Sequence, residues 1–307
     1  MSSRLKLKKI IGLTLVELLV ATAISIIVFS MALTIYLSAK DQYASLKDKI
    51  SLEVKELSTK KLISNFVKRA GFACKFGYTN QTPYVDRTGD SLESYFLGSG
   101  SGVRVGPLPF ATSSNMSEAL ETGCTGECYQ AGTDYILIRT EEKHTKLTIN
   151  NSFDTSLALD DTDSLAAGDY LALCNKDNIN LVKISDMNSV DGVATLTQPS
   201  SESIYYTGDY AGKYELQIIY IRNTGDTDID GNDIYSLYTY IKEGSSQGNS
   251  YELVRDVKDL KVEYATVSGG NITWNAVTTD LELDSNYPAI KVLFTVDGES
   301  FSKILVL

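Results

Sequence analysis

Three aspartates at alternate positions come nearest to a metal-binding motif in this sequence. Asp226, Asp228 and Asp230 precede Gly231 in the stretch DTDIDGND. This spacing matches the start of a calcium loop, in which oxygen ligands surround a tight glycine turn. The match then fails, because Leu237 occupies the twelfth position, where a bidentate glutamate belongs. The stretch therefore predicts either a calcium site or an acidic hairpin turn, in which Asp, Asn and Gly are common.

The cysteines offer a second kind of chemistry, either disulfide bonds or a zinc site. They are Cys74, Cys124, Cys128 and Cys174. Zinc is disfavoured because the sequence has no C-x2-C pair and one histidine. Three disulfide pairings are possible. Cys124 and Cys128 are close together among turn-forming residues, so we expect a small disulfide loop there, and Cys74 would then pair with Cys174.

The single histidine, His144, lies in the charged stretch RTEEKHTKL, which we interpret as a solvated turn between two strands. The sequence contains no G-x-S-x-G, phosphate-binding loop or H-E-x-x-H motif. The paired acids Glu141-Glu142 and Asp160-Asp161 are adjacent in acidic loops and indicate solubility rather than a glycosidase site. We therefore expect no enzymatic activity.

The longest apolar segment runs from residue 13 to residue 39 and contains one charge and no Pro or Gly. As a helix of about 1.5 Å per residue it is long enough to cross a bilayer. Basic residues in the first twelve positions place that end in the cytoplasm and residues 40–307 outside. A cleavable secretory signal is the alternative, since Ala21-Thr22-Ala23 offers a cleavage site. It fits less well because the apolar run continues beyond that site.

Glu17 is the one charge in this segment, and an intramembrane acid indicates a function. The run from Gly12 to Leu19, GLTLVELL, resembles the class III signal of type IV prepilins and pseudopilins, in which a basic leader ends in Gly and Glu is the fifth residue after it. The resemblance implies cleavage between Gly12 and Leu13 by the prepilin peptidase and N-methylation of Leu13. It also implies that Glu17 pairs with the new amine of a neighbouring subunit during assembly. The family usually has Phe where this chain has Leu13.

Charge is distributed unevenly along the chain. The net charge is −11, yet residues 1–12 and 40–69 each sum to +4 and residues 13–39 to −1, so residues 70–307 carry −18. An acidic body of this kind argues against a nucleic-acid partner, because phosphate binding needs a basic face.

The pattern predicts an α+β fold: a long N-terminal helix packed on a mainly antiparallel β-sheet head. Apolar residues at helical spacing continue to about residue 57, and Gly71 follows basic residues as a helix stop. Alternating apolar segments then predict strands. They are 134–139, 146–149, 169–174, 181–185, 193–197, 214–221, 234–242, 259–267, 289–296 and 301–307.

We accordingly divide the chain into a leader peptide (1–12), a transmembrane assembly half of the helix (13–39), an amphipathic half (40–70) and a globular head (71–307). The stripe on the amphipathic half is expected to cover a sheet. It comprises Tyr43, Leu46, Ile50, Val54 and Leu57.

A second stretch resembles the C-terminal block of PilW-type minor pilins, although Thr239 stands where that family has a basic residue. The matching positions are Leu237-Tyr238, Glu252-Leu253-Val254, Val257, Leu260 and Tyr264. The resemblance implies a minor pilin in the inner membrane, later in the pilus. Its partners would be minor and major pilins, the prepilin peptidase and the inner-membrane assembly platform. The J-type pseudopilin of type II secretion is the close alternative, and a membrane-anchored periplasmic binding module is the more distant one.

Overall fold

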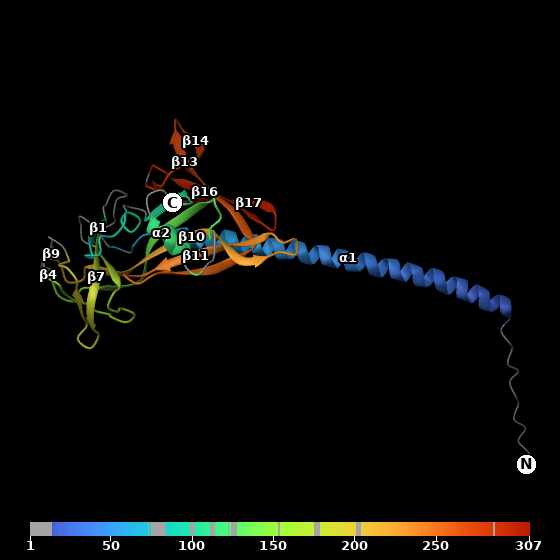
Figure 1. Cartoon of the computed structure of the whole chain (residues 1–307), viewed down its shortest axis with the longest axis horizontal. Helices are drawn as coiled ribbons and strands as arrows, with labels where there is room; N and C mark the ends of the chain where they lie inside the picture. The colour runs from blue at the N-terminus through green and yellow to red at the C-terminus, as the bar shows by residue number, and fades with distance from the viewer. Residues whose placement is uncertain are drawn as a thin grey trace, which may run out of the picture. The chain divides into compact units, whose positions relative to one another are not determined.

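A computed structural model describes the protein as two compact units, Met1–Val54 and Lys55–Leu307. Figure 1 shows the elements in chain order. The structure describes residues 14–72, 74, 84–98, 102–110, 114–121, 123, 128–152, 154–174, 179–200, 204–284 and 286–307. Gly12, Leu13 and Cys124 therefore lie outside the described residues.

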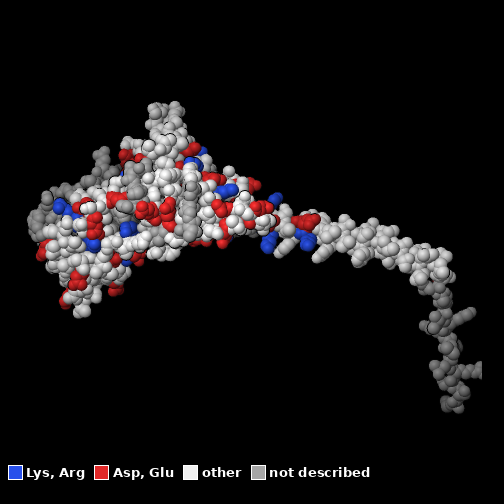
Figure 2. All heavy atoms as spheres, in the orientation of Figure 1, with Lys and Arg blue, Asp and Glu red and all other residues white. Residues whose placement is uncertain are grey.

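The first element is helix α1, Leu15–Lys68, which is long and apolar enough to cross a membrane. Its side chains are exposed from Thr14 to Ser51, and Figure 2 shows most of this stretch without charge. The helix ends as the sequence predicts: Gly71 has a φ of 96°, and its N–H donates to the carbonyl of Arg139 at 2.8 Å.

The buried face of α1 differs from the predicted one. Leu57, which belongs to the second unit, is 68% exposed, so the prediction that the stripe covers the sheet is wrong at this residue. Burial begins at Thr59 and continues through Ile63, Phe66 and Val67, which share one helix face. The earlier stripe residues, in the first unit, are also exposed.

The second unit is built mainly of strands, with one short helix, α2 (Ser114–Glu121). The large sheet has the order β15-β2-β3-β10-β6-β7-β8-β5, with β1 on β7, β11 on β10 and β12 on β11. Its strands are β1 (Tyr84–Arg87), β2 (Val103–Pro107), β3 (Asp134–Lys146), β5 (Ser156–Ala158), β6 (Tyr170–Cys174), β7 (Ile179–Asn188), β8 (Val193–Leu196), β10 (Tyr210–Thr227), β11 (Asp233–Lys242), β12 (Asn249–Arg255) and β15 (Leu281–Glu282).

Strand β10 is the centre of the large sheet. It pairs with β3 along one edge, and with β6 and then β11 along the other. Its first thirteen residues are all buried. A tyrosine-rich core packs around it, including Tyr135, Tyr214 and Tyr220, whose hydroxyls all have hydrogen-bond partners.

A second sheet has the order β14-β13-β16-β17. Its strands are β13 (Val257–Ser268), β14 (Asn271–Ala276), β16 (Ala289–Val296) and β17 (Glu299–Val306). Alternate residues of β16 are buried, because one face of this sheet lines the core. Strand β13 contacts β3, β10 and β11 of the large sheet. The short strands β4 (Asn151–Ser152) and β9 (Ile204–Tyr205) form a separate pair.

Lys55 joins the start of the second unit to the second sheet. Its ammonium lies 2.8 Å from Asp256, which connects β12 to β13, and 2.9 Å from Asp297, which lies between β16 and β17. Partial burial alone lowers the pKa of Lys55, but the two carboxylates outweigh it and the pKa is raised. We call Lys55, Asp256 and Asp297 the lysine clamp.

The predicted α+β fold is confirmed: a long helix precedes an antiparallel β-rich unit, in which β1 with β7 is the one parallel pair among the described strands. The local prediction around His144 was wrong. β3 runs from Asp134 to Lys146, so the turn placed at His144 is strand, and the separate strand expected at 146–149 is replaced by an isolated bridge at Leu147. Residues 72–130, for which the sequence predicts no strand, contain β1, β2 and α2.

Candidate functional site

The start of α1 holds the first candidate site. Thr14 precedes the helix and Glu17 lies in its first turn. The N–H and hydroxyl of Thr14 both donate to Oε2 of Glu17 at 3.0 Å, and the N–H of Glu17 donates to Oγ1 of Thr14 at 3.3 Å. This reciprocal arrangement is a capping box, which satisfies N–H groups that the first turn leaves without partners.

Sequence reasoning missed this local role, although the Thr-x-x-Glu spacing of the capping box is readable in TLVE. Both bonds from Thr14 end on one carboxylate oxygen, Oε2, whereas a carboxylate can accept about four hydrogen bonds. Glu17 therefore keeps acceptor capacity after it has capped its own helix.

Three hydroxyls of the apolar stretch are satisfied within the helix. Thr22 donates to the carbonyl of Leu19 at 2.9 Å, and Ser30 to that of Ile27 at 2.8 Å. Thr34 donates to the carbonyl of Ser30 at 2.9 Å. Such back-bonding lets hydroxyls lie in lipid without an external partner. Glu17 differs from these three because it carries a charge and keeps acceptor capacity after capping.

The structure joins Cys74 to Cys174, with their Cα atoms 6.1 Å apart. This disulfide connects the segment after α1 to the end of β6. Cys128 is also disulfide-bonded. Cys124, the partner predicted for it, lies outside the described residues.

The acidic stretch from Asp226 to Asp233 forms the connection between β10 and β11. Asp228 accepts hydrogen bonds from the backbone N–H groups of Asp230 and Asn232, at 2.9 and 2.8 Å. Asp226 instead faces Arg255, 2.7 Å away. The three predicted calcium ligands therefore do not converge. Among the described residues, no group of three or more His, Cys, Asp or Glu side chains is arranged to hold a metal.

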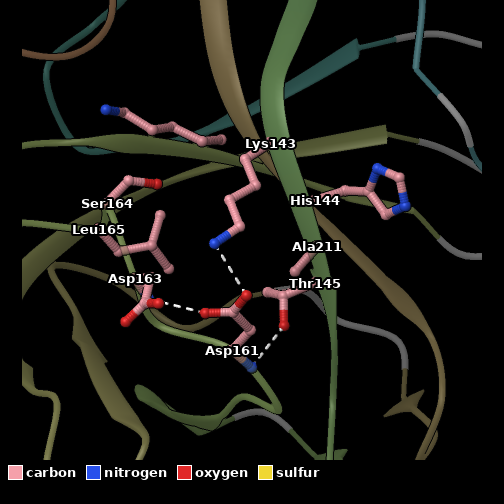
Figure 3. Close-up of a pocket in the computed structure, with 9 residues that line it drawn as sticks. Lys143, His144, Thr145, Asp161, Asp163, Ser164, Leu165 and Ala211 are labelled. Atoms are coloured by element: carbon pink, nitrogen blue, oxygen red, sulfur yellow. Dashed lines mark hydrogen bonds and ion pairs between the residues drawn. The ribbon is translucent and has the colours of Figure 1, made fainter.

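His144 also takes no part in a catalytic arrangement. Its Nδ1 lies 3.0 Å from a carboxylate oxygen of Glu141, and its ring stacks on Tyr210 with 5.5 Å between centroids. Figure 3 shows Lys143 and Thr145 directed toward Asp161, with His144 directed away from them. This follows from the strand, because successive side chains point to opposite faces. The hollow that these residues line has a volume of about 10 Å³, room for one water molecule.

The head contains buried ionic groups that sequence reasoning missed. Arg139 is fully buried in β3; its guanidinium lies 2.5 Å from Glu282 of β15, and its Nε donates to the carbonyl of Tyr95 at 2.9 Å. Two residues before Glu282, Asp280 accepts hydrogen bonds from Tyr95 and Tyr135, at 2.6 and 2.8 Å. We call the segment from Asp280 to Glu282 the acidic strap.

The acidic strap holds the connection between the two sheets against β2 and β3. Two glycines make room for it. A Cβ at Gly98 would lie 2.5 Å from the Arg139 guanidinium, and one at Gly106 would lie 2.3 Å from Asp280. Tyr135 and Arg139 are more than a hundred residues away from Asp280 and Glu282 in the sequence. No local sequence pattern could therefore have predicted these contacts.

Comparison with known proteins adds no assignment: no family model, curated protein or solved structure matches this chain.

Proposed function

We propose that this chain is a minor pilin, a structural subunit of a type IV pilus that acts in its initiation or tip complex. Glu17 carries the proposal: an acid in the first turn of a membrane-length helix, five residues after Gly12 and behind a basic leader.

The free energy of this carboxylate favours an external partner. A carboxylate within a membrane helix is costly unless it is paired. The capping interaction with Thr14 offsets part of that cost. A cation contributed by a neighbouring subunit would offset the remainder. Cleavage between Gly12 and Leu13 would create such a cation, the amine of Leu13, in every subunit.

The compartment and partners follow from the same proposal. The helix would hold the subunit in the inner membrane, with the head in the periplasm and later on the pilus. The Cys74–Cys174 disulfide fits an oxidising compartment of that kind. The partners would be other minor and major pilins, the prepilin peptidase and the inner-membrane assembly platform. The chain itself would be a substrate of that peptidase and not an enzyme.

Mass spectrometry of the mature N-terminus tests the processing step. We expect a chain that begins at N-methylated Leu13, and we expect Gly12→Asp to block the cleavage. A mature chain that begins at any other residue would remove the pilin proposal and favour the membrane-anchored binding module.

Deletion of the gene separates a minor pilin from the J-type pseudopilin. We expect fewer pili and normal secretion of exoproteins, with pili restored by the native chain. Restoration should fail with Glu17→Ala and succeed with Thr22→Ala, a matched change in the same helix. Normal pili with lost secretion would instead assign the chain to a type II secretion machine.

A further inference from the structure

The head contains a cleft of about 520 Å³ that the proposed function does not use. It lies between α2, the end of β11 and the turn that follows β11. Its size falls within the range of sites for small molecules, about 300–1,000 Å³. All the side chains discussed below belong to the second compact unit.

The inner part of the cleft is apolar and well packed. Phe96, Met116 and Tyr240 line it and are 5%, 3% and 1% exposed, respectively. They belong to the tyrosine-rich core, so the cleft opens onto closely packed side chains. Side chains that are fixed in this way give a ligand a preformed surface.

Charged groups of both signs surround this apolar surface. Lys242 lines the cleft from β11, and Glu93 and Glu118 line it from the segment before Phe96 and from α2. Lys242 is half-buried and lies 5.8 Å from the centroid of the Phe96 ring.

Lys242 differs from most of the partly buried lysines of the head in its partners. Its ammonium donates to the carbonyl of Ser246 at 2.5 Å, and no carboxylate of the described residues lies within 4.0 Å of it. Most other described lysines that are buried or half-buried have a carboxylate oxygen within 2.9 Å; Lys303 of β17 is the exception. Those with such a partner are Lys55, Lys60, Lys183, Lys213 and Lys291. Consistently, burial lowers the pKa of Lys242, an effect that Asp90 only partly opposes.

A half-buried ammonium without a carboxylate partner favours an anionic group from a ligand. Two glutamates in the same cleft disfavour a ligand that carries only negative charge. The apolar surface between them matches a hydrophobic or aromatic body.

We propose that this cleft binds a zwitterion of the amino-acid class with an aromatic or large apolar side chain. The ligand carboxylate pairs with Lys242, its ammonium faces Glu93 and Glu118, and its side chain packs on Phe96 and Met116.

Methionine methyl groups provide the test, because the chain has four methionines in different settings. Met116 lines the cleft, Met187 lies in the head outside it, and Met31 lies in the apolar part of α1. The full chain, labelled with ¹³C-methyl methionine and held in detergent micelles, is titrated with L-phenylalanine. Parallel titrations use 3-phenylpropanoate, which lacks the ammonium, and 2-phenylethylamine, which lacks the carboxylate.

We expect a saturable shift of the Met116 methyl signal with L-phenylalanine, while Met31 and Met187 stay unchanged. Each analogue should bind at least about tenfold more weakly, because it loses one charge-assisted interaction. Lys242→Gln should weaken L-phenylalanine binding by a similar factor and leave 2-phenylethylamine unaffected. Lys258→Gln, at an exposed lysine of β13, is the matched control and should change neither.

Three results would overturn the proposal. One is a Met116 signal that does not move at millimolar L-phenylalanine. Another is equal binding of the three compounds, or of the native and Lys242→Gln chains. The third is a shift shared by Met31 and Met187, which would indicate partition into the micelle.

Discussion

The two units of this protein differ in how far apart in the sequence the partners of a polar side chain lie. In the apolar part of α1, polar side chains form hydrogen bonds with residues three or four positions away, as in Thr14 with Glu17 and Thr34 with Ser30. In the head, the fully buried Arg139 instead pairs with Glu282, more than a hundred residues away. A helix that depends only on its own turns can enter lipid, or a bundle of other helices, without losing any tertiary contact. A head held by long-range pairs has to fold as one piece.

The largest effect should come from breaking a long-range pair in the head. Glu282→Ala leaves the fully buried Arg139 without its carboxylate, so we expect the free energy of unfolding to fall by about 3–5 kcal/mol. Urea denaturation followed by tyrosine fluorescence measures this change. Glu263→Gln, at the partly exposed pair with Lys291, is the control and should cost no more than about 1 kcal/mol. Equal losses in the two variants would show that the burial of Arg139 does not make its pair more important than an exposed one.

Removing the disulfide between Cys74 and Cys174 should have the next largest effect. It closes a loop with a sequence separation of 100, so the double change to serine should lower the free energy of unfolding by about 2–5 kcal/mol. Denaturation under reducing and non-reducing conditions measures the difference. The helix content of α1 in micelles should stay constant, because its hydrogen bonds are local. A loss of helix signal along with the head would show that the two units are coupled.

The next prediction concerns the lysine clamp, whose Lys55 is the first residue of the second unit. Lys55→Ala removes contacts with Asp256 and Asp297, and we expect a loss of about 1 kcal/mol, with faster amide exchange near the end of α1. Lys47→Ala, at an exposed lysine of the first unit, should change neither quantity.

The clamp also predicts a pH dependence, because the pKa of Lys55 is raised in the folded chain. Its contribution should be complete below the ordinary pKa of lysine, about 10.4, and should be lost as the pH rises through the raised value. Native and Lys55→Ala chains should therefore converge in stability at high pH. A difference that persisted there would rule out the ion pair as its source.

The smallest effect should come from the start of the helix. Thr14→Ala removes the capping box, and we expect a cost of about 1 kcal/mol that is confined to the first turn. Thr14→Ser, which keeps the hydroxyl, should retain most of the cap. Amide exchange of the first turn measures the loss, while the denaturation midpoint of the head should not move. A shift of that midpoint would mean that the cap stabilises more than its own helix.

Periodicity made much of the fold predictable from the sequence. The alternation in AIKVLFTV and the apolar run before Lys40 gave the correct element types, because burial on one face imposes a fixed spacing. Local chemistry also allowed the hairpin at Asp226–Asp233 to be foreseen as one of two alternatives. The buried face of α1 was missed, because the exposed stripe ending at Leu57 is as regular as the buried one that begins at Thr59.

The pairing of distant charges could not have been predicted. Nothing near Arg139 indicates that its partner is Glu282 or that Gly98 leaves space for both. The continuation of β3 through His144 was hidden for a related reason. A charged stretch by itself predicts a turn. Here it is a strand because β10 pairs with it, as Gly212 does with His144.

The lysine clamp has a mechanical consequence. Asp256 lies between β12 of the large sheet and β13 of the second sheet, and Asp297 lies between β16 and β17 of the second sheet. A pull along the last turns of α1 would therefore reach the junction of the two sheets through Lys55. The acidic strap, in which Glu282 pairs with Arg139, would then oppose separation of the second sheet from β2 and β3.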